Sequence, residues 1–97
     1  MSLPIHWTAE AVESFTDIIA HLESNWSERQ IRKFIRKTKD ALKQIAAFPL
    51  MYEASRMRPG VRKGFITKQC SLLYKVKEEH IDLIAFWDNR RKPTSSN

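Results

Sequence analysis

The 97-residue sequence has one cysteine, Cys70, and two glycines, and these shortages exclude several kinds of site. A lone cysteine cannot form an internal disulfide or a C-x-x-C metal motif, and a glycine-rich phosphate loop needs more glycines. The histidines His6, His21 and His80 are widely separated along the chain, so we expect them to lie far apart, with no metal site and no cofactor. No Ser-His-Asp ordering stands out either. These absences argue against a conventional hydrolase or a nucleotide-dependent enzyme.

Long hydrophobic runs are also missing. The longest apolar stretches, such as residues 81–87, are interrupted by charge and are much shorter than the roughly 20 residues of a membrane-spanning helix. The N-terminal residues lack the basic and apolar regions of a signal peptide. We therefore expect no membrane association and a cytoplasmic location. With 42% hydrophobic residues, the chain has the composition of one folded domain over residues 1–97.

Basic residues outnumber acidic ones by 17 to 11, which gives a net charge of +6. The charge is segregated along the chain. The first 24 residues hold four acids and no Lys or Arg, whereas residues 56–77 hold seven bases and no acid. A second basic block spans residues 29–43. This distribution predicts a polyanionic or acidic partner.

The first half of the chain predicts a strand followed by two helices. Residues 3–7 alternate apolar and polar side chains as a strand does, and Thr8 is placed to cap a helix over residues 9–24. Ser27 and Gln30 form a capping box that begins a second helix, which ends before Pro49. The apolar face predicted for the first helix consists of Val12, Phe15, Ile18, Ile19 and Leu22. That of the second consists of Ile31, Phe34, Ile35, Thr38, Leu42 and Ile45.

A basic stripe follows the opposite side of the second helix: Arg29, Arg32, Lys33, Arg36, Lys39 and Lys43. It is interpreted either as a solvated helix face or as a contact surface for a polyanion. In the second interpretation the chain is a basic nucleic-acid-binding module that uses this stripe.

The second half predicts a loop over residues 48–60 and then three strands, over residues 61–67, 71–77 and 80–87, with residues 92–97 as a frayed tail. The last strand is expected at the centre of the sheet, covered on both faces. One face would carry Ile81, Leu83, Ala85 and Trp87, and the other Ile84 and Phe86. The fold class is therefore α+β with the order β-α-α-β-β-β, a helical hairpin packed on one face of a mainly antiparallel four-stranded sheet.

Basic residues gather at the ends of the predicted strands. They are Arg62, Lys63, Lys68, Arg90 and Arg91. Adjacent strands can bring such ends together, and guanidinium and ammonium groups so placed can bind a phosphate or an acidic side chain. Ordinary charged strand ends are the alternative interpretation.

Three segments resemble a known protein family. The opening Ile5-x-Trp7-Thr8-x-x-Ala11, the strand 72–76 (LLYKV) and the closing 86–93 (FWDNRRKP) are similar to the RelE/ParE toxins of bacterial type II toxin–antitoxin systems, also called plasmid stabilisation proteins. The resemblance covers residues 3–93 and implies a small basic toxin that a cognate antitoxin holds inactive. Members either cleave ribosome-bound mRNA or inhibit DNA gyrase.

The same resemblance guides the choice between the two activities. The ribonuclease branch carries an Arg before the Leu-x-Tyr-x-Val strand, and here that position is Ser71, or Cys70 if the register slips by one. The tail after Arg91 has neither the Tyr nor the His of that branch. The resemblance thus favours ParE-like inhibition of gyrase. A ribosome-dependent endoribonuclease, with Arg62, Lys63 and Arg90 as its catalytic residues, is the alternative.

An antitoxin must cover apolar surface on the free toxin. Trp26, Phe48 and Met51, at the ends of the predicted helices, are the apolar residues for which the helical stripes account least. They are the predicted antitoxin-binding residues. The alternative is that they close the end of the core.

Overall fold

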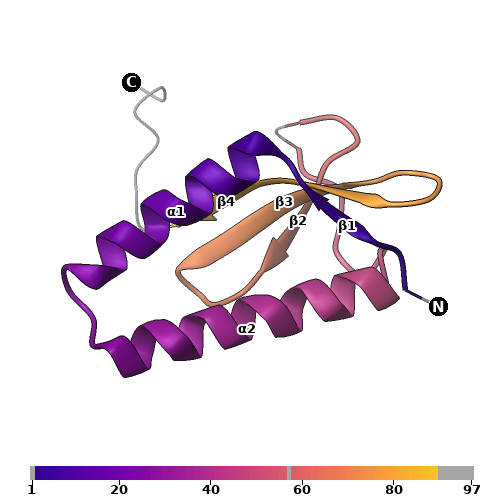
Figure 1. The fold of residues 1–97 in the computed structure, drawn as a ribbon. Coiled ribbons are helices and arrows are strands. Elements are labelled where there is room, and N and C mark those ends of the chain that lie inside the picture. Colours follow the sequence, from indigo (N-terminus) through magenta and orange to yellow (C-terminus); the bar gives the residue numbers. More distant parts are fainter. Residues whose placement is uncertain (1, 57, 90–97) are drawn as a thin grey trace, which may run out of the picture.

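Two helices pack against a four-stranded sheet in the computed structural model, which describes residues 2–56 and 58–89 (Figure 1). In chain order the elements are β1 (Ile5–Trp7), α1 (Ala9–Glu23), α2 (Glu28–Ala47), β2 (Arg62–Phe65), β3 (Cys70–Val76) and β4 (Ile81–Asp88). This arrangement confirms the predicted α+β fold class. The tail predicted at residues 92–97 lies outside the described residues. No helix in the described part of the chain is long and apolar enough to cross a membrane.

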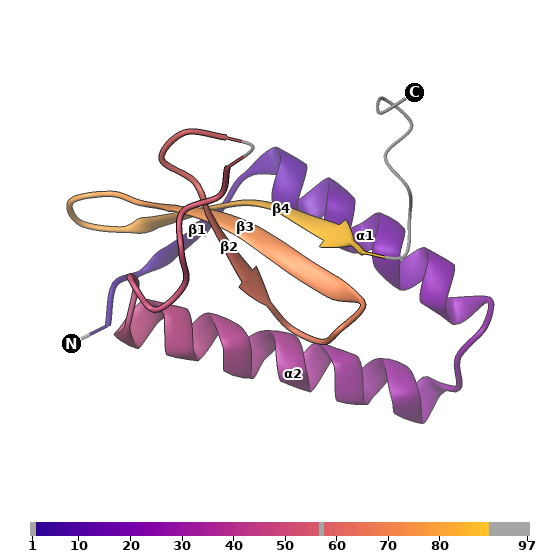
Figure 2. The ribbon, with the colours of Figure 1, turned by 180° about the vertical axis from the view of Figure 1, so that it is seen from behind.

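The sheet has the strand order β1-β4-β3-β2, which Figure 2 shows from behind. β1 runs parallel to β4, while β3 is antiparallel to both β4 and β2. β1 and β2 are the edge strands, and a hydrogen bond from the Ile81 amide to the Pro4 carbonyl at 2.9 Å joins the start of β4 to the residue before β1. The last strand therefore lies between the first and the third, so the two ends of the sequence meet in the sheet.

Both helices begin at the caps that the sequence predicts. Thr8 Oγ1 accepts a hydrogen bond from the Ala11 amide at 3.1 Å and donates to the Leu83 carbonyl at 2.8 Å, so the cap also fastens α1 to β4. Ser27 and Gln30 form the reciprocal capping box of α2. Each cap satisfies amides that the helix leaves unpaired.

The core lies between the helices and one face of the sheet. From the helices it takes Ile18, Leu22, Phe34 and Ile45, and from the strands Leu72, Tyr74, Ile81, Leu83 and Phe86. The prediction that Val12 belongs to the core is wrong, because its side chain is 51% exposed. Ala11 is fully buried in its place, since it lies seven and eleven residues before Ile18 and Leu22 on the same helical face.

The sheet has two unlike faces. We call the face that carries Leu72, Tyr74, Ile81, Leu83 and Phe86 the helix face, because both helices pack on it. Its opposite, the open face, carries His6, Lys63, Phe65, Ser71, Lys75, Asp82 and Trp87, which the strand register places at alternating positions.

A shift in register between β3 and β4 changes which residues of β4 reach each face. Tyr74 pairs with Leu83 and Leu73 with Ala85, so Ile84 is an extra residue in the ladder. Phe86 consequently lies on the helix face with its ring 4.8 Å from that of Phe15. Trp87 lies on the open face and is 42% exposed. The predicted distribution of β4 residues, and its coverage on both faces, are therefore wrong, although β4 is central as predicted.

Candidate functional site

A row of side chains crosses the open face near the end of β4. Phe65, Ser71 and Trp87 are neighbours in register on β2, β3 and β4. The two aromatic residues of this row, Phe65 and Trp87, are 51% and 42% exposed. Lys63 precedes Phe65 on the same face and holds its ammonium 5.8 Å from the centre of the Phe65 ring. Exposed aromatic surface beside a cation is typical of a surface that binds another molecule.

Ser71, between the two aromatic residues, is fully buried. Its hydroxyl lies 3.0 Å from Asn89 Oδ1 and 2.8 Å from Asn89 Nδ2. Asn89 Nδ2 also lies 3.3 Å from the Lys68 carbonyl, which belongs to the turn between β2 and β3. Asn89 therefore covers the serine and joins the end of β4 to this turn. Cys70, the alternative position for the arginine of the ribonuclease branch, faces the core.

Arg62 and Lys63 are separated by the alternation of β2. Arg62 pairs with Tyr74 and lies on the helix side, where its guanidinium donates to the Tyr52 carbonyl at 2.6 Å. Lys63 lies on the open face. Two side chains on opposite faces of a sheet cannot bind the same phosphate group. Arg62 instead fastens the loop after α2 to the sheet.

Tyr74 lies beside Arg62 and is fully buried. Its hydroxyl donates to the Pro49 carbonyl at 2.7 Å. Burial raises the pKa of the Tyr74 phenol. A hydrogen bond with the backbone of Tyr52 and the positive charge of Arg62 lower this pKa, but they offset the effect of burial only in part. The phenol therefore stays neutral and serves as a hydrogen-bond donor that holds the loop after α2.

Of the other members of the predicted basic cluster, the structure describes Lys68, which follows the opposite end of β2. Lys68 is exposed in the turn after β2, where Asn89 contacts its backbone. The structure thus brings Lys68 next to the end of β4, directly before Arg90. Arg90 and Arg91 themselves lie outside the described residues.

The three predicted antitoxin-binding residues do not form one surface. Trp26 precedes α2, where it is half-buried and packs edge-on against Phe34 with ring centres 6.3 Å apart. Phe48 and Met51 follow α2 and are 68% and 46% exposed. The 20 residues of α2 place these two sites about 30 Å apart. Leu50 is 67% exposed and extends the second site, although the sequence pattern did not predict it there.

The basic stripe of α2 is exposed along its whole length, at Arg29, Arg32, Lys33, Arg36, Lys39 and Lys43. Arg32 forms an ion pair with Glu28 one turn before it, and both side chains are well exposed. Exposed pairs of this kind contribute little to stability. The geometry is that of a solvated helix face, and it is equally accessible to a polyanion.

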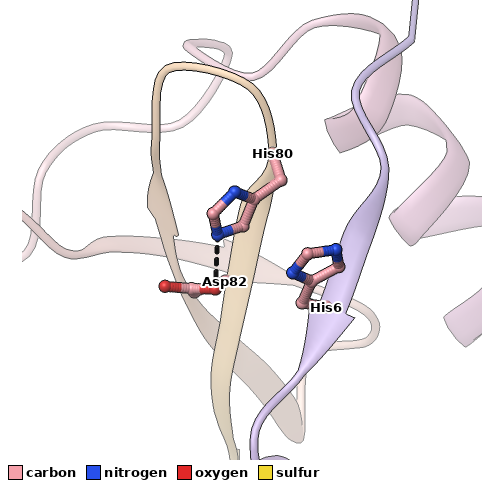
Figure 3. A group of neighbouring side chains, drawn as sticks. All are labelled: His6, His80 and Asp82. Atoms are coloured by element: carbon pink, nitrogen blue, oxygen red, sulfur yellow. Dashed lines mark hydrogen bonds and ion pairs between the residues drawn. The ribbon is translucent and has the colours of Figure 1, made fainter.

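The expectation that the histidines lie far apart is wrong for His6 and His80. Their rings stack with centres 4.3 Å apart, and His80 Nε2 is 3.0 Å from Asp82 Oδ1 (Figure 3). The parallel pairing of β1 with β4 causes this approach, because it sets His6 opposite Asp82. The sequences of the individual strands do not indicate that β1 pairs with β4, so they could not predict that His6 and His80 meet. His21 is exposed on α1, away from this cluster.

The fold and the open face define a class of small, two-layered α+β proteins. Within it, residues 5–93 match the family model of the ParE toxin of the type II toxin–antitoxin system parDE. Because the match covers most of the sequence, the chain belongs to the ParE toxin family. This confirms the resemblance to RelE/ParE toxins. No curated protein sequence gives a significant match.

Solved structures of similar fold come from several bacteria. A chain of the chromosomal ParDE toxin–antitoxin system from P. aeruginosa has a TM-score of 0.73 and 19% identity, covering 90% of this chain and 96% of that one. The YoeB dimer from Staphylococcus aureus has a TM-score of 0.59 and 20% identity, covering 88% and 94%. A copper-bound mutant toxin from Helicobacter pylori has a TM-score of 0.56 and 15% identity, covering 91% and 96%. These likenesses concern the fold.

Proposed function

We propose that this ParE-family toxin inhibits DNA gyrase by binding, without a bond-breaking reaction of its own, and that a cognate antitoxin neutralises it. The match to the ParE family model supports the class of target. The environment of Ser71 carries the argument against ribonuclease chemistry, because this residue stands where the ribonuclease branch has an arginine. It is fully buried, and its hydroxyl is engaged by Asn89.

Cleavage of RNA by its own 2′-hydroxyl needs a base, an acid and a group that stabilises added negative charge. Of the two basic residues predicted on β2, Lys63 alone reaches the open face, and it supplies only the stabilising charge. The imidazoles of His6 and His80 lie on the same face as Lys63, but beside Asp82. Lys63 is in register with Leu73 and, through it, with Ala85, which lies three residues after Asp82 on β4. Because Ile84 is an extra residue, these two rows are only two β3 residues apart, about 7 Å, but β3 also separates Lys63 from β4 by about 10 Å, which is too far for one scissile phosphate.

Supercoiling of relaxed plasmid by purified gyrase tests the proposal. We expect the purified toxin to inhibit supercoiling or to trap gyrase in cleavage complexes, and we expect co-purified antitoxin to restore activity. Unaltered supercoiling at a large excess of folded toxin would overturn the gyrase assignment. Primer extension on translated mRNA tests the alternative, because breaks in the ribosomal A site would identify an endoribonuclease instead.

Variants of the open face sharpen this test. Phe65→Ala and Trp87→Ala remove exposed aromatic surface from the row across β2 and β4, and we expect each to weaken inhibition. Val12→Ala is the matched control, because Val12 is similarly exposed but lies on α1. Equal inhibition by all three variants would place the gyrase contact elsewhere on the toxin.

We further propose that the antitoxin covers the apolar site after α2. Phe48, Leu50 and Met51 together expose large hydrophobic side chains within four residues of sequence. Exposed apolar clusters of this kind mark surfaces that a partner covers. Trp26, predicted to join this surface, is half-buried against Phe34 at the other end of α2.

A further inference from the structure

Two histidines and an aspartate converge at the end of the open face where β1 lies beside β4. Figure 3 shows the two rings side by side, with the Asp82 carboxylate below His80. One ring nitrogen of His6, one of His80 and a carboxylate oxygen of Asp82 all lie within 4.8 Å of one another. No other group of three or more His, Cys, Asp or Glu side chains within residues 2–56 and 58–89 has this spacing.

The backbone fixes all three positions. His6 is opposite Asp82 in the parallel register of β1 and β4. His80 lies two residues before Asp82, so the two share a face. Hydrogen bonds hold both sides of the cluster: the Ile81 amide donates to the Pro4 carbonyl at 2.9 Å, and the Lys77 amide donates to the His80 carbonyl at 2.8 Å. The three side chains are therefore presented by a hydrogen-bonded part of the sheet.

We propose that His6, His80 and Asp82 bind a divalent late transition-metal ion, of the class of Ni²⁺, Cu²⁺ and Zn²⁺. Neutral imidazole nitrogens suit these ions, and two histidines with one carboxylate form a common three-ligand set. Mg²⁺ and Ca²⁺ prefer oxygen ligands, so two imidazoles disfavour them. Three protein ligands leave a coordination position for water or for a donor from another molecule.

To hold an ion, the cluster needs one rearrangement, in which His6 turns out of its stack with His80. In a tetrahedral site with metal–ligand distances of about 2.1 Å, ligand atoms lie about 3.4 Å apart. His80 Nε2 and Asp82 Oδ1 are already 3.0 Å apart. The remaining approach falls to His6, whose exposed side chain would rotate from its stacked position to point a ring nitrogen at the same ion.

The charges near the cluster permit a cation. Lys75 is in register with Asp82, but its side chain extends toward Gly60, where a Cβ atom would lie 3.4 Å from Lys75 Cε. In the described part of the chain, the side-chain contact of Asp82 is the hydrogen bond with His80. A bound ion would take the place of the hydrogen between these two side chains and would join the β1 edge strand to the turn before β4.

Calorimetric titration of the tag-free full chain with Zn²⁺ tests the site, with Mg²⁺ as the ion expected not to bind. We expect one Zn²⁺ per chain, and we expect His6→Ala, His80→Ala and Asp82→Asn each to weaken binding at least roughly tenfold. His21→Ala is the matched control, because His21 is an exposed histidine on α1. The Zn²⁺ affinity of this variant should equal that of the unaltered chain. Thermal melts in the absence of metal establish that the variants are folded.

Imidazole ¹⁵N NMR of the unaltered chain gives a second measurement that needs no variant. Zn²⁺ should shift the ring-nitrogen resonances of His6 and His80 and leave those of His21 in place. The absence of binding at millimolar Zn²⁺, or binding that the His6 and His80 variants do not weaken, would overturn the proposal. So would loss of binding in His21→Ala to the same extent.

Discussion

The hydroxyl of Ser71 and the side-chain amide of Asn89 form a closed pair, with contacts of 3.0 and 2.8 Å, across the end of the open face. Ser71 is fully buried, whereas Asn89 is half-buried and also reaches the Lys68 carbonyl. The pair thus buries the hydroxyl that stands at the position of the ribonuclease arginine. It also fixes the residue that follows β4 against the turn between β2 and β3.

Asn89→Ala is expected to lower the free energy of unfolding by about 1 to 3 kcal/mol, because it leaves the buried Ser71 hydroxyl without this partner. Ser71→Ala should cost less, about 1 kcal/mol, since the half-buried Asn89 amide can bond to water. The double variant should cost less than the sum of the two. Urea unfolding of all four proteins measures this coupling, and additivity within about 0.5 kcal/mol would show that the pair does not act as a unit.

Tyr74→Phe is expected to destabilise the fold by roughly 1 kcal/mol, because it removes the donor to the Pro49 carbonyl and leaves the ring in place. The raised pKa of Tyr74 also predicts a pH dependence. The folded state keeps the phenol proton to higher pH than the unfolded state does. Its contribution is therefore complete below the ordinary pKa of 10.0 and is lost as pH rises through the folded value.

Chemical unfolding between pH 8 and pH 11, a range chosen around the ordinary phenol pKa of about 10, measures this dependence. We expect the Tyr74→Phe variant to lose less stability across the interval than the unaltered chain. Tyr52→Phe is the control, since Tyr52 is the other tyrosine of the chain and is only half-buried. Identical pH profiles for the unaltered chain and Tyr74→Phe would contradict the assignment.

Arg62 and Lys63 should respond differently to truncation. Arg62→Ala removes the donor to the Tyr52 carbonyl on the helix side, so we expect a loss of about 1 to 3 kcal/mol in unfolding free energy. Lys63→Ala alters the open face and should change stability by no more than about 0.5 kcal/mol, while weakening inhibition of the target. Melting curves together with the supercoiling assay separate the two effects. A large stability loss in Lys63→Ala alone would reverse the roles assigned here.

The sequence predicted features that depend on local chemistry. The cap at Thr8 follows from its place directly before a helical pattern, the cap at Ser27 follows from Gln30 three residues later, and the end of α2 follows from Pro49. The order and kind of all six elements also followed from periodicity and turn residues. Such signals are contained within one helical turn or one strand, so no tertiary information is needed to read them.

Features that depend on which strands are neighbours could not be predicted. His6 and His80 are 74 positions apart in the sequence, and they meet because β1 pairs with β4 and not with another strand. The position of Trp87 depends on the register shift opposite Leu73 and Tyr74, which reverses the alternation of β4. The basic cluster was predicted because adjacent strands can bring their ends together, but alternation along β2 places Arg62 and Lys63 on opposite faces.

Trp26→Ser and Met51→Ser test the antitoxin surface at its two predicted ends. Met51 is 46% exposed, so we expect Met51→Ser to leave the melting temperature nearly unchanged and to weaken antitoxin binding by more than about 1 kcal/mol. Trp26 packs against Phe34, so Trp26→Ser should cost roughly 2 kcal/mol of stability and affect antitoxin binding less.

Thermal melts and titration with purified antitoxin measure both quantities on the same samples. Val12→Ser supplies the control for loss of exposed apolar surface, because Val12 is 51% exposed on α1. If Met51→Ser and Val12→Ser bind antitoxin equally well, the apolar site after α2 is not the interface. If Trp26→Ser loses affinity while keeping its melting temperature, the interface lies instead at the start of α2, where Trp26 borders Lys33 and Lys37.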